Sequence, residues 1–318
     1  MGLIVHLALQ ALEMAIALAA APLLTGFVRK VKARLQRRAG PPLLQVYRDL
    51  ARLVAKEAVV PEASSWLFRV SPYVIFAATW VAAALVPEFA TNLQFSWSGD
   101  LIVIVALLGS ARFFQMLAAL DSGTAFGGIG ASREAMLASL AEPAMLMIVF
   151  TVALVAGTSQ LSAIATFMHS GAEGLRLSLA LGLVALVMVG LTETGRFPVD
   201  NPATHLELTM VHEAMVLEYS GRHLALIELA GAMRLLLYMS LIACIFAPFG
   251  IAPPGAGPAA LALGLASYAG KLGFGAVALA GFETTIAKMR VFRIPNFVGA
   301  ALMLGLLGTL LLFMSASL

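Results

Sequence analysis

Long apolar runs separated by short polar segments dominate the 318-residue sequence. Windows of bilayer length find eight such runs, near residues 3–28, 70–88, 100–119, 134–157, 177–195, 222–247, 259–281 and 296–316. Each run is close to the roughly 20 residues that a helix needs to cross the hydrocarbon core. Helix is expected because hydrocarbon offers backbone groups no other partner, and the alternating pattern of a membrane barrel is missing. The pattern predicts an all-α polytopic membrane protein, with one membrane domain over residues 1–318.

The first polar connection, residues 29–69, predicts an additional, shorter helix on the membrane surface. Leu43, Tyr47, Leu50 and Val54 fall on one face of this helix, and Arg48, Arg52 and Lys56 follow one another at intervals of four residues. A basic amphipathic helix of this kind lies along the bilayer interface. Two roles stay open for it: attraction to anionic lipid with control of topology, or docking of a soluble partner.

The distribution of basic residues predicts the topology. Sixteen of the 20 Lys and Arg residues lie in the odd-numbered connections between the spans, whereas the even-numbered connections hold Arg176 alone. Loops rich in Lys and Arg remain in the cytoplasm. We therefore expect the basic loop 29–69 and the charged loop 196–221 in the cytoplasm, and both termini on the outer side of the cell inner membrane.

The composition agrees with a membrane protein and excludes several kinds of site. A mean hydropathy of +0.94 would leave large apolar areas facing water in a soluble protein. Cys244 is the only cysteine, which excludes a disulfide framework and a multi-cysteine iron–sulfur site within this chain. The HEAMV motif has Val216 where a zinc-protease motif needs its second histidine, and no nucleophile elbow is found. We expect no metal, no catalytic centre in this chain and no nucleic-acid partner.

The segment 121–134, DSGTAFGGIGASRE, lacks the third glycine of a dinucleotide motif and follows no strand. It is predicted to form a turn closed by Ser132 as the N-cap of the next helix, with Glu134 in the first helical turn. Glu142 would then lie roughly 13–15 Å along that helix, and hence within the membrane.

The segment 193–219 gathers acidic, basic and histidine side chains between two apolar runs. Pro198 and Pro202 forbid a continuous helix there, so we expect a loop and then a helix from Ala203 onward. Ionisable groups at or inside a bilayer are costly, and proteins keep them for proton pathways, ligands or docking. The segment is therefore interpreted as the working face of the protein.

Single ionisable residues also occur within the spans. They are Glu13, Arg112, Glu228, Arg234 and Lys271. Each one taken singly fits a structural ion pair with a neighbouring helix. Taken together they indicate a hydrated polar path, because charges facing lipid would be costly.

Four segments in order resemble one known family. They read ARLQRRAGPP, GASREAMLASLAEPA, ETGRFPVDNPATHLELTMVHEAMVLEYSG and AKMRVFRIPNF. They resemble the membrane-anchor subunit of respiratory complex I, of the subunit 1 or H type. They look closer still to its counterparts in energy-converting hydrogenases of the formate hydrogenlyase and hydrogenase-4 type.

The resemblance implies a subunit without a redox centre of its own in an oxidoreductase complex. Such a subunit docks the soluble electron-transfer arm on the membrane and passes redox energy to proton or sodium translocation. The implied partners are hydrogenase-like large and small subunits, a ferredoxin-like iron–sulfur subunit and antiporter-like membrane subunits. Iron–sulfur and nickel–iron centres would belong to those partners, and this chain itself would bind no cofactor.

Residues and resemblance together indicate two sets of site residues. Proton coupling is expected at Glu134, Glu142, Glu193, Asp200, Glu207, Glu213, Glu218, Glu228 and Lys271. Docking of the arm is expected at Arg34, Arg37, Arg38, Gly40, Arg133, Arg196, His205, His212 and Tyr219.

Other functions remain open at this point. Quinone-reducing relatives carry a denser run of carboxylates after the Asp200 position, where this chain has Ala203 and His205. That departure favours the hydrogenase-type branch over a quinone-binding subunit of an NADH:quinone oxidoreductase. A secondary ion transporter is disfavoured because no inverted repeat is visible. A purely structural anchor would use the same charges only to hold subunits together.

Overall fold

The computed structural model describes residues 3–91, 94–170, 177–196, 198–200, 210–287, 289 and 293–316. Ten α-helices are found in these ranges: α1 (Leu3–Leu35), α2 (Gln45–Val54), α3 (Trp66–Ala84), α4 (Leu101–Asp121), α5 (Ala125–Ala156), α6 (Leu161–His169), α7 (Leu177–Glu193), α8 (Gly221–Phe246), α9 (Pro258–Thr285) and α10 (Ile294–Ala316). Two short 3₁₀ turns, η1 (Ser96–Ser98) and η2 (Glu213–Met215), lie in connections. No strand is found in the described ranges, which confirms the all-α class.

The predicted membrane spans are found as helices. Seven of the described helices, α1, α3, α4, α5, α8, α9 and α10, are long and apolar enough to cross a membrane. The remaining predicted span, residues 177–195, is α7, which is apolar but only 17 residues long. Seventeen residues is about the lower limit for crossing the hydrocarbon core. The chain is a multi-pass membrane protein.

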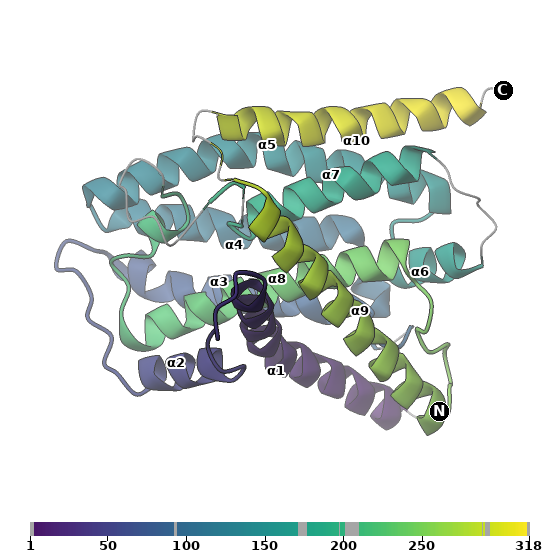
Figure 1. The fold of residues 1–318 in the computed structure, drawn as a ribbon, viewed down its shortest axis with the longest axis horizontal. Coiled ribbons are helices and arrows are strands. Elements are labelled where there is room, and N and C mark those ends of the chain that lie inside the picture. Colours follow the sequence, from purple (N-terminus) through teal and green to yellow (C-terminus); the bar gives the residue numbers. More distant parts are fainter. Residues whose placement is uncertain are drawn as a thin grey trace.

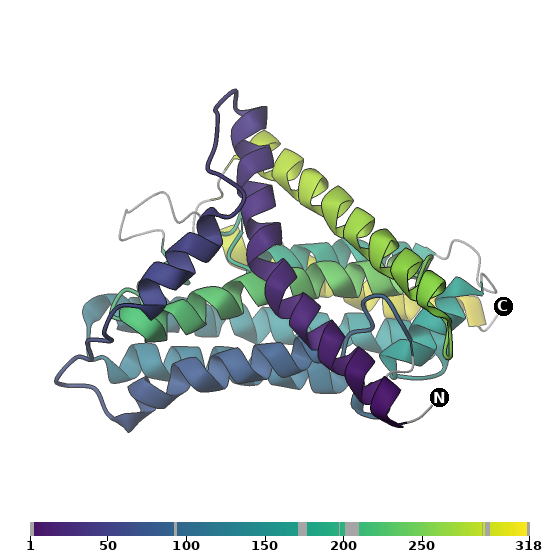
Figure 2. The same cartoon turned by 90° about the horizontal axis from the view of Figure 1, so that it is seen from below.

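Helices α3, α4, α5, α7, α8 and α10 run side by side, whereas α1 and α9 cross this bundle obliquely (Figures 1 and 2). Helix α5 packs against α4, α7 and α10, and α8 packs against α1 and α3. Fully buried alanines such as Ala17, Ala21 and Ala144 lie in the main core. Small residues let helix backbones approach closely, which is how membrane helices gain packing energy. Both chain ends lie at the same end of the bundle (Figure 1).

Helix α2 is the predicted surface helix. None of its residues is buried, and it contacts α1 and α8 at the end of the bundle away from the two termini (Figure 1). The hydroxyl of Tyr47, on its apolar face, donates a hydrogen bond to the carbonyl oxygen of Ala19 on α1. Tyr47 and Leu50 on the apolar face are half-buried, whereas Leu43 and Val54 on the same face and the basic Arg48 and Arg52 are exposed.

The first span extends beyond its predicted end at residue 28. Helix α1 continues to Leu35, so the basic residues from Arg29 to Arg34 lie on its last two turns. The C-terminal end of α1 projects from the bundle (Figure 2). Apolarity alone could not show this extension, because a helix that leaves the hydrocarbon continues with polar side chains.

The predicted N-cap of the fourth span was wrong. Helix α5 begins seven residues earlier than Ser132, and Thr124 is its N-cap, with Oγ1 accepting a hydrogen bond from the N–H of Gly127 at 3.2 Å. A Cβ atom at Gly127 would lie 2.3 Å from the carbonyl oxygen of Ala119 on α4. The glycines that suggested a flexible turn therefore allow the start of α5 to lie against the end of α4.

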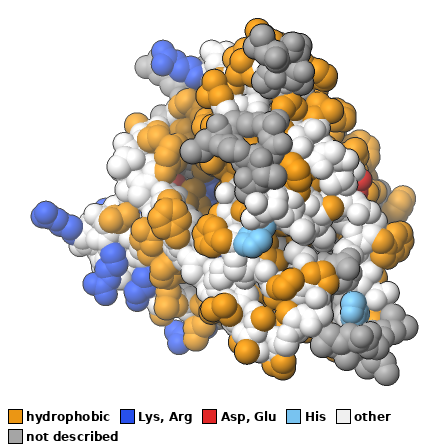
Figure 3. Space-filling model, turned by 90° about the vertical axis from the view of Figure 1, so that its right-hand side faces the viewer, with side chains coloured by type: hydrophobic (Ala, Val, Ile, Leu, Met, Phe, Trp, Pro, Cys, Tyr) orange, Lys and Arg blue, Asp and Glu red, His pale blue; other side chains and the backbone are white. Residues whose placement is uncertain are grey.

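The surface is largely apolar. Figure 3 shows hydrophobic side chains spread over the end of the bundle that carries the termini, with Lys and Arg side chains along one edge of the view. Phe274, Leu263 and Phe313 are between 60% and 79% exposed on α9 and α10. Exposed apolar area of this extent marks contact with lipid or with partner proteins.

Candidate functional site

Arg112 lies at the centre of a buried charge cluster. It belongs to α4, about 13 Å before the end of that helix, and is 3% exposed. Its Nε lies 3.2 Å from Oε1 of Glu134, and its Nη1 lies 3.5 Å from Oε1 of Glu142. Its Nη2 contacts Oε1 of Glu193, the last residue of α7. One guanidinium thus meets three carboxylates from two other helices.

A fourth helix joins the cluster through Arg234. This residue of α8 is 5% exposed, and its Nη1 donates a hydrogen bond of 3.3 Å to the backbone oxygen of Glu193. The end of α7 therefore lies between a guanidinium from α4 and one from α8. We define the Arg112 cluster as Arg112, Glu134, Glu142, Glu193 and Arg234.

The segment after Asp200 reaches the same cluster. Nδ1 of His212 lies 3.6 Å from Oε2 of Glu134, and the backbone N–H groups of Val211 and His212 each donate to Oδ2 of Asp200 at 3.2 Å. Nη1 of Arg133 donates to the carbonyl oxygen of Met210 at 2.9 Å. These contacts hold residues 210–212 against α5, so a movement of this segment would displace the imidazole beside Glu134.

The charges of the Arg112 cluster do not balance. Two arginines and three carboxylates give a net charge of −1 when the imidazole of His212 is neutral. One added proton would bring the net charge to zero, whether a carboxylate or the imidazole of His212 took it. Because charges interact strongly in a buried site, the charge on any one member affects the others. The arrangement suits the uptake and release of one proton.

The hydrogen bonding of the cluster is incomplete. Nε and Nη1 of Arg112 and Oε2 of Glu134 lie close enough to their partners for ion pairing, yet they form no hydrogen bond within the described residues. A cavity of about 10 Å³ touches Arg112, Glu142, Glu193 and Tyr238. That volume is near the minimum for one water molecule.

A second ion-pair group lies at the C-terminal end of α9. Glu283 is 5% exposed, and its carboxylate lies 3.0 Å from Nζ of Lys32 on α1 and 3.2 Å from Nη1 of Arg196 after α7. Burial lowers the pKa of the Arg196 guanidinium, and the Glu283 carboxylate opposes that shift. Glu283 therefore joins the two oblique helices to the segment that follows Glu193.

Tyr219 is enclosed within the chain. It is 4% exposed, its ring stacks on Phe68 with 4.0 Å between centroids, and its hydroxyl donates to the carbonyl oxygen of Phe68 at 3.0 Å. Burial raises the pKa of the Tyr219 phenol well above its ordinary value. In this chain the side chain fixes the segment before α8 to the start of α3.

The other predicted site residues are dispersed. Arg34, Arg37, Arg38 and Gly40 are exposed at the end of α1 and in the turn that follows it. Gly40 has φ +71°, and a Cβ there would lie 2.7 Å from Cβ of Ala33, so this turn requires glycine. Glu228 is exposed on α8, and Nζ of Lys271 lies 4.7 Å from the centre of the Phe249 ring. Neither Glu228 nor Lys271 belongs to the Arg112 cluster.

The helix predicted from Ala203 onward is wrong for the part that can be checked. Residues 210–219 contain only the 3₁₀ turn η2, with Glu213 in that turn and Glu218 half-buried after it. His205 and Glu207 lie outside the described residues. The hydrogen bonds that Asp200 accepts stabilise a compact loop at 210–212 in place of a helix.

Three residues that matter most in this geometry were not placed in a site from the sequence. Arg112 and Arg234 were counted as isolated charges within spans, and Glu283 was not singled out. The excess of acidic over basic residues in the predicted coupling set was the signal that could have indicated these arginines. The predicted coupling set held eight carboxylates and one lysine, and acidic groups in a membrane require cations nearby.

A separate pair of buried carboxylates lies near the end of the bundle that carries the termini. Oε1 of Glu13 accepts a hydrogen bond of 2.8 Å from the backbone N–H of Glu88, and these residues are 2% and 4% exposed. Burial raises the pKa of the Glu88 carboxyl, in the connection after α3, to about 8, although a hydrogen bond with Tyr268 acts in the opposite direction. Glu88 is therefore protonated at neutral pH.

This raised pKa predicts a pH dependence of stability. The folded carboxyl of Glu88 keeps its proton up to about pH 8, whereas the unfolded one releases it near 4.5. The free energy of unfolding should therefore fall as pH rises through this window, by on the order of 4–5 kcal/mol in full. Thermal unfolding in detergent at about pH 5 and about pH 9 should show Glu88→Gln gaining stability over the wild type as pH rises. Glu62→Gln, at an exposed carboxyl, should show no such gain.

Comparison with known proteins gives a consistent result. A protein-family model described as NADH dehydrogenase matches residues 7–314. Formate hydrogenlyase subunit 4 of Escherichia coli (strain K12) is 35% identical over 283 residues, which cover 89% of this chain and 91% of that protein. Hydrogenase-4 component C of the same organism is 36% identical over 229 residues, covering 72% of this chain and 71% of that protein.

A solved structure shares the fold. A chain of the membrane-bound sulfane sulfur reductase, an archaeal respiratory membrane complex, superposes with a TM-score of 0.75 at 21% sequence identity. The match covers 96% of this chain and 98% of that chain. The family model extends over nearly the whole sequence, so the chain belongs to the NADH dehydrogenase family of complex I subunit 1, or H-type, membrane proteins.

Proposed function

We propose that this chain is the membrane-anchor and coupling subunit of a complex-I-related, energy-converting hydrogenase of the hydrogenase-4 or formate hydrogenlyase type. The support from comparison is the similarity to formate hydrogenlyase subunit 4 and hydrogenase-4 component C. The observation that carries the coupling role is the Arg112 cluster. Three carboxylates around the buried Arg112 guanidinium, with Arg234 beside them, carry a net charge of −1 and can exchange one proton.

The proposed orientation follows the basic residues. The end of the bundle that carries α2 faces the cytoplasm, as do Arg34, Arg37 and Arg38 after the first span. Both termini lie on the outer side of the inner membrane. Hydrogenase-like and ferredoxin-like subunits would dock at this exposed basic surface. Antiporter-like membrane subunits would lie beside the bundle.

The proposed coupling is electrostatic. An electron that enters the docked arm changes the electrostatic potential at Asp200 and at the segment 210–212. The backbone of His212 is held by Asp200, and the imidazole of His212 lies beside Glu134. The change in potential therefore alters the proton affinity of the Arg112 cluster. The Glu142 side chain, 46% exposed, would pass the proton to a neighbouring subunit.

The test is the number of protons translocated per electron in membrane vesicles that carry the intact complex. Glu134→Gln and Glu193→Gln should each lower this ratio by at least about half, while electron transfer to the terminal acceptor continues. Glu62→Gln, at an exposed carboxyl, serves as the matched control.

Two results would contradict the proposal. An unchanged ratio in both variants would remove the cluster from the coupling path. If less complex assembled but the remaining complex kept a normal number of protons per electron, the charges would have a structural role only.

A further inference from the structure

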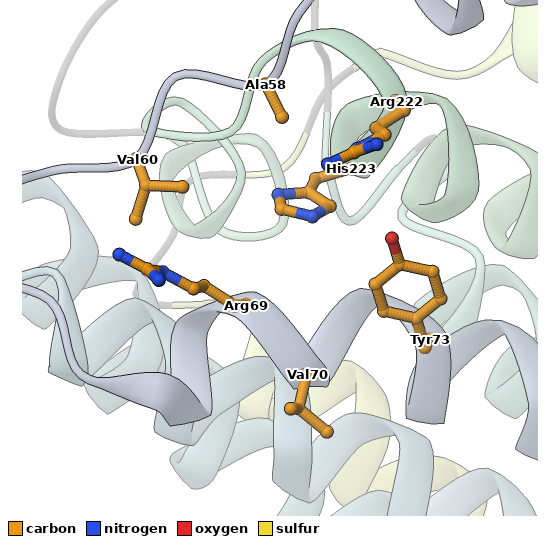
Figure 4. Close-up of a pocket in the computed structure, with 7 residues that line it drawn as sticks. All are labelled: Ala58, Val60, Arg69, Val70, Tyr73, Arg222 and His223. Carbon is orange, nitrogen blue, oxygen red and sulfur yellow. The ribbon is translucent and has the colours of Figure 1, made fainter.

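An open cavity of about 590 Å³ lies between the starts of α3 and α8 and the segment that precedes α3. It is lined by Ala58, Val60, Arg69, Val70, Tyr73, Arg222 and His223 (Figure 4). This cavity is separate from the Arg112 cluster, with which it shares no residue. It lies at the end of the bundle that carries α2.

The wall of the cavity is fixed by backbone contacts. The hydroxyl of Ser220 accepts a hydrogen bond of 2.8 Å from the N–H of Val59 and donates one of 3.2 Å to the carbonyl oxygen of the same residue. Gly221 has φ +53°, and a Cβ there would lie 2.3 Å from the carbonyl oxygen of Glu57. Only glycine permits this close approach of the segment 57–60 to the start of α8. The cavity is thus preformed.

The polar groups of the cavity are cations and donors. Arg69 comes from the first turn of α3 and Arg222 from the first turn of α8, and no acidic side chain is among the lining residues. Neither arginine forms an ion pair with any residue in the described ranges. A cavity lined by two guanidinium groups and no carboxylate is suited to an anion with several oxygen atoms, such as phosphate.

His223 adds an unsatisfied polar group. It is 6% exposed, and its Nδ1 is buried without a hydrogen-bond partner in the described part of the chain. Its ring is fixed edge-on against Tyr73 and Tyr219, with 5.8 Å and 6.5 Å between ring centroids. The hydroxyl of Tyr73 points toward the region of Arg222 and His223 (Figure 4). A phosphate group in the cavity would meet the Tyr73 hydroxyl and the His223 ring beside the two guanidinium groups.

The surroundings of the cavity are those of a membrane interface. Trp66 at the start of α3 is 72% exposed, Tyr73 is 49% exposed and Val70 is 40% exposed. Exposed Trp and Tyr at the ends of membrane helices mark the level of the lipid headgroups. Cationic pockets between membrane helices at this level bind anionic lipid headgroups.

We propose that this cavity is a binding site for the phosphate group of an anionic phospholipid. Arg69 and Arg222 bind the phosphate oxygens, and Tyr73 and His223 supply further polar contacts. The acyl chains leave the cavity along the exposed apolar side of α3, past Val70. A soluble phosphate would use the arginines equally well, but it would leave the apolar wall without a partner.

The experiment is native mass spectrometry of the full chain in detergent with added phosphatidylglycerol or phosphatidylcholine. We expect the wild type to retain phosphatidylglycerol in preference to phosphatidylcholine. The Arg69→Gln/Arg222→Gln variant should retain phosphatidylglycerol at least about 10-fold more weakly, because two charge-assisted contacts are lost. The Arg69→Lys/Arg222→Lys variant keeps the charge without the planar fork, and it should give an intermediate loss.

The matched control is Arg48→Gln/Arg52→Gln on α2, which removes the same charge from exposed residues at the same end of the bundle. Equal losses in both Gln variants would show general attraction to negative charge and would overturn the proposal. Displacement of the lipid by inorganic phosphate in the buffer would indicate a soluble phosphate site instead. Failure of the Lys variant to weaken binding, with a folded Gln variant also unaffected, would exclude the arginines as ligands.

Discussion

Replacing Arg112 with methionine is expected to destabilise the chain by about 3–5 kcal/mol, the usual consequence of removing one partner from a buried ion pair. Arg112→Met leaves the buried carboxylates of Glu134 and Glu193, and the partly exposed carboxylate of Glu142, without their shared cation. Their mutual repulsion favours protonation or local opening. Thermal and denaturant unfolding in detergent would measure the loss.

Second-site variants separate this effect from a simple loss of packing. Arg112→Met combined with Glu193→Gln removes one of the three negative charges, so it should recover part of the lost stability. Arg48→Met, on the exposed face of α2, is the control for the same substitution without burial and should stay within about 0.5 kcal/mol of the wild type. A loss below about 1 kcal/mol for Arg112→Met would contradict the cluster as described.

Neutralising Glu283 should also destabilise the chain strongly. Glu283→Gln leaves Lys32 and Arg196, 3.0 and 3.2 Å from the same carboxylate, as neighbouring cations without their anion. Because Glu283 is 5% exposed, we expect a loss of about 3 kcal/mol. Hydrogen exchange should become faster in the last turn of α9 and at residues 194–196, and it should stay unchanged in α5 and α10.

The matched control for this variant is Glu57→Gln, an exposed carboxyl in the segment before α3. Combining Glu283→Gln with Lys32→Met removes one of the two unpaired cations and should restore part of the protection. Uniform acceleration of exchange throughout the bundle would show global destabilisation, and it would contradict a local junction between α1, α9 and the segment after α7.

The elements of the fold could be predicted from the sequence because their physical cause is local. Each span needs about 20 apolar residues, and basic side chains gather in the loops on one side of the membrane. The ends of the helices were less predictable. Thr124 is the N-cap of α5 because the glycine at Gly127 fits against the end of α4, and this contact depends on how the two helices pack rather than on the apolar pattern of either one.

The candidate site was predictable in kind but not in arrangement. Glu134, Glu142 and Glu193 were expected to act together, and the structure places them around a single guanidinium. The role of Arg112 depends on how α4, α5, α7 and α8 pack, which single-span patterns do not specify. Glu228 and Lys271 are also ionisable residues within predicted spans, but they lie outside the Arg112 cluster.

Glu134 and Glu142 are eight residues apart on α5, and thus about 12 Å apart along its axis. Arg112 reaches both of them, the first almost fully enclosed and the second with 46% of its side chain open to the flank of the bundle. A single long side chain therefore bridges two depths of the membrane. Any shift of its guanidinium from one carboxylate toward the other would move positive charge between the enclosed interior of the bundle and its exposed surface.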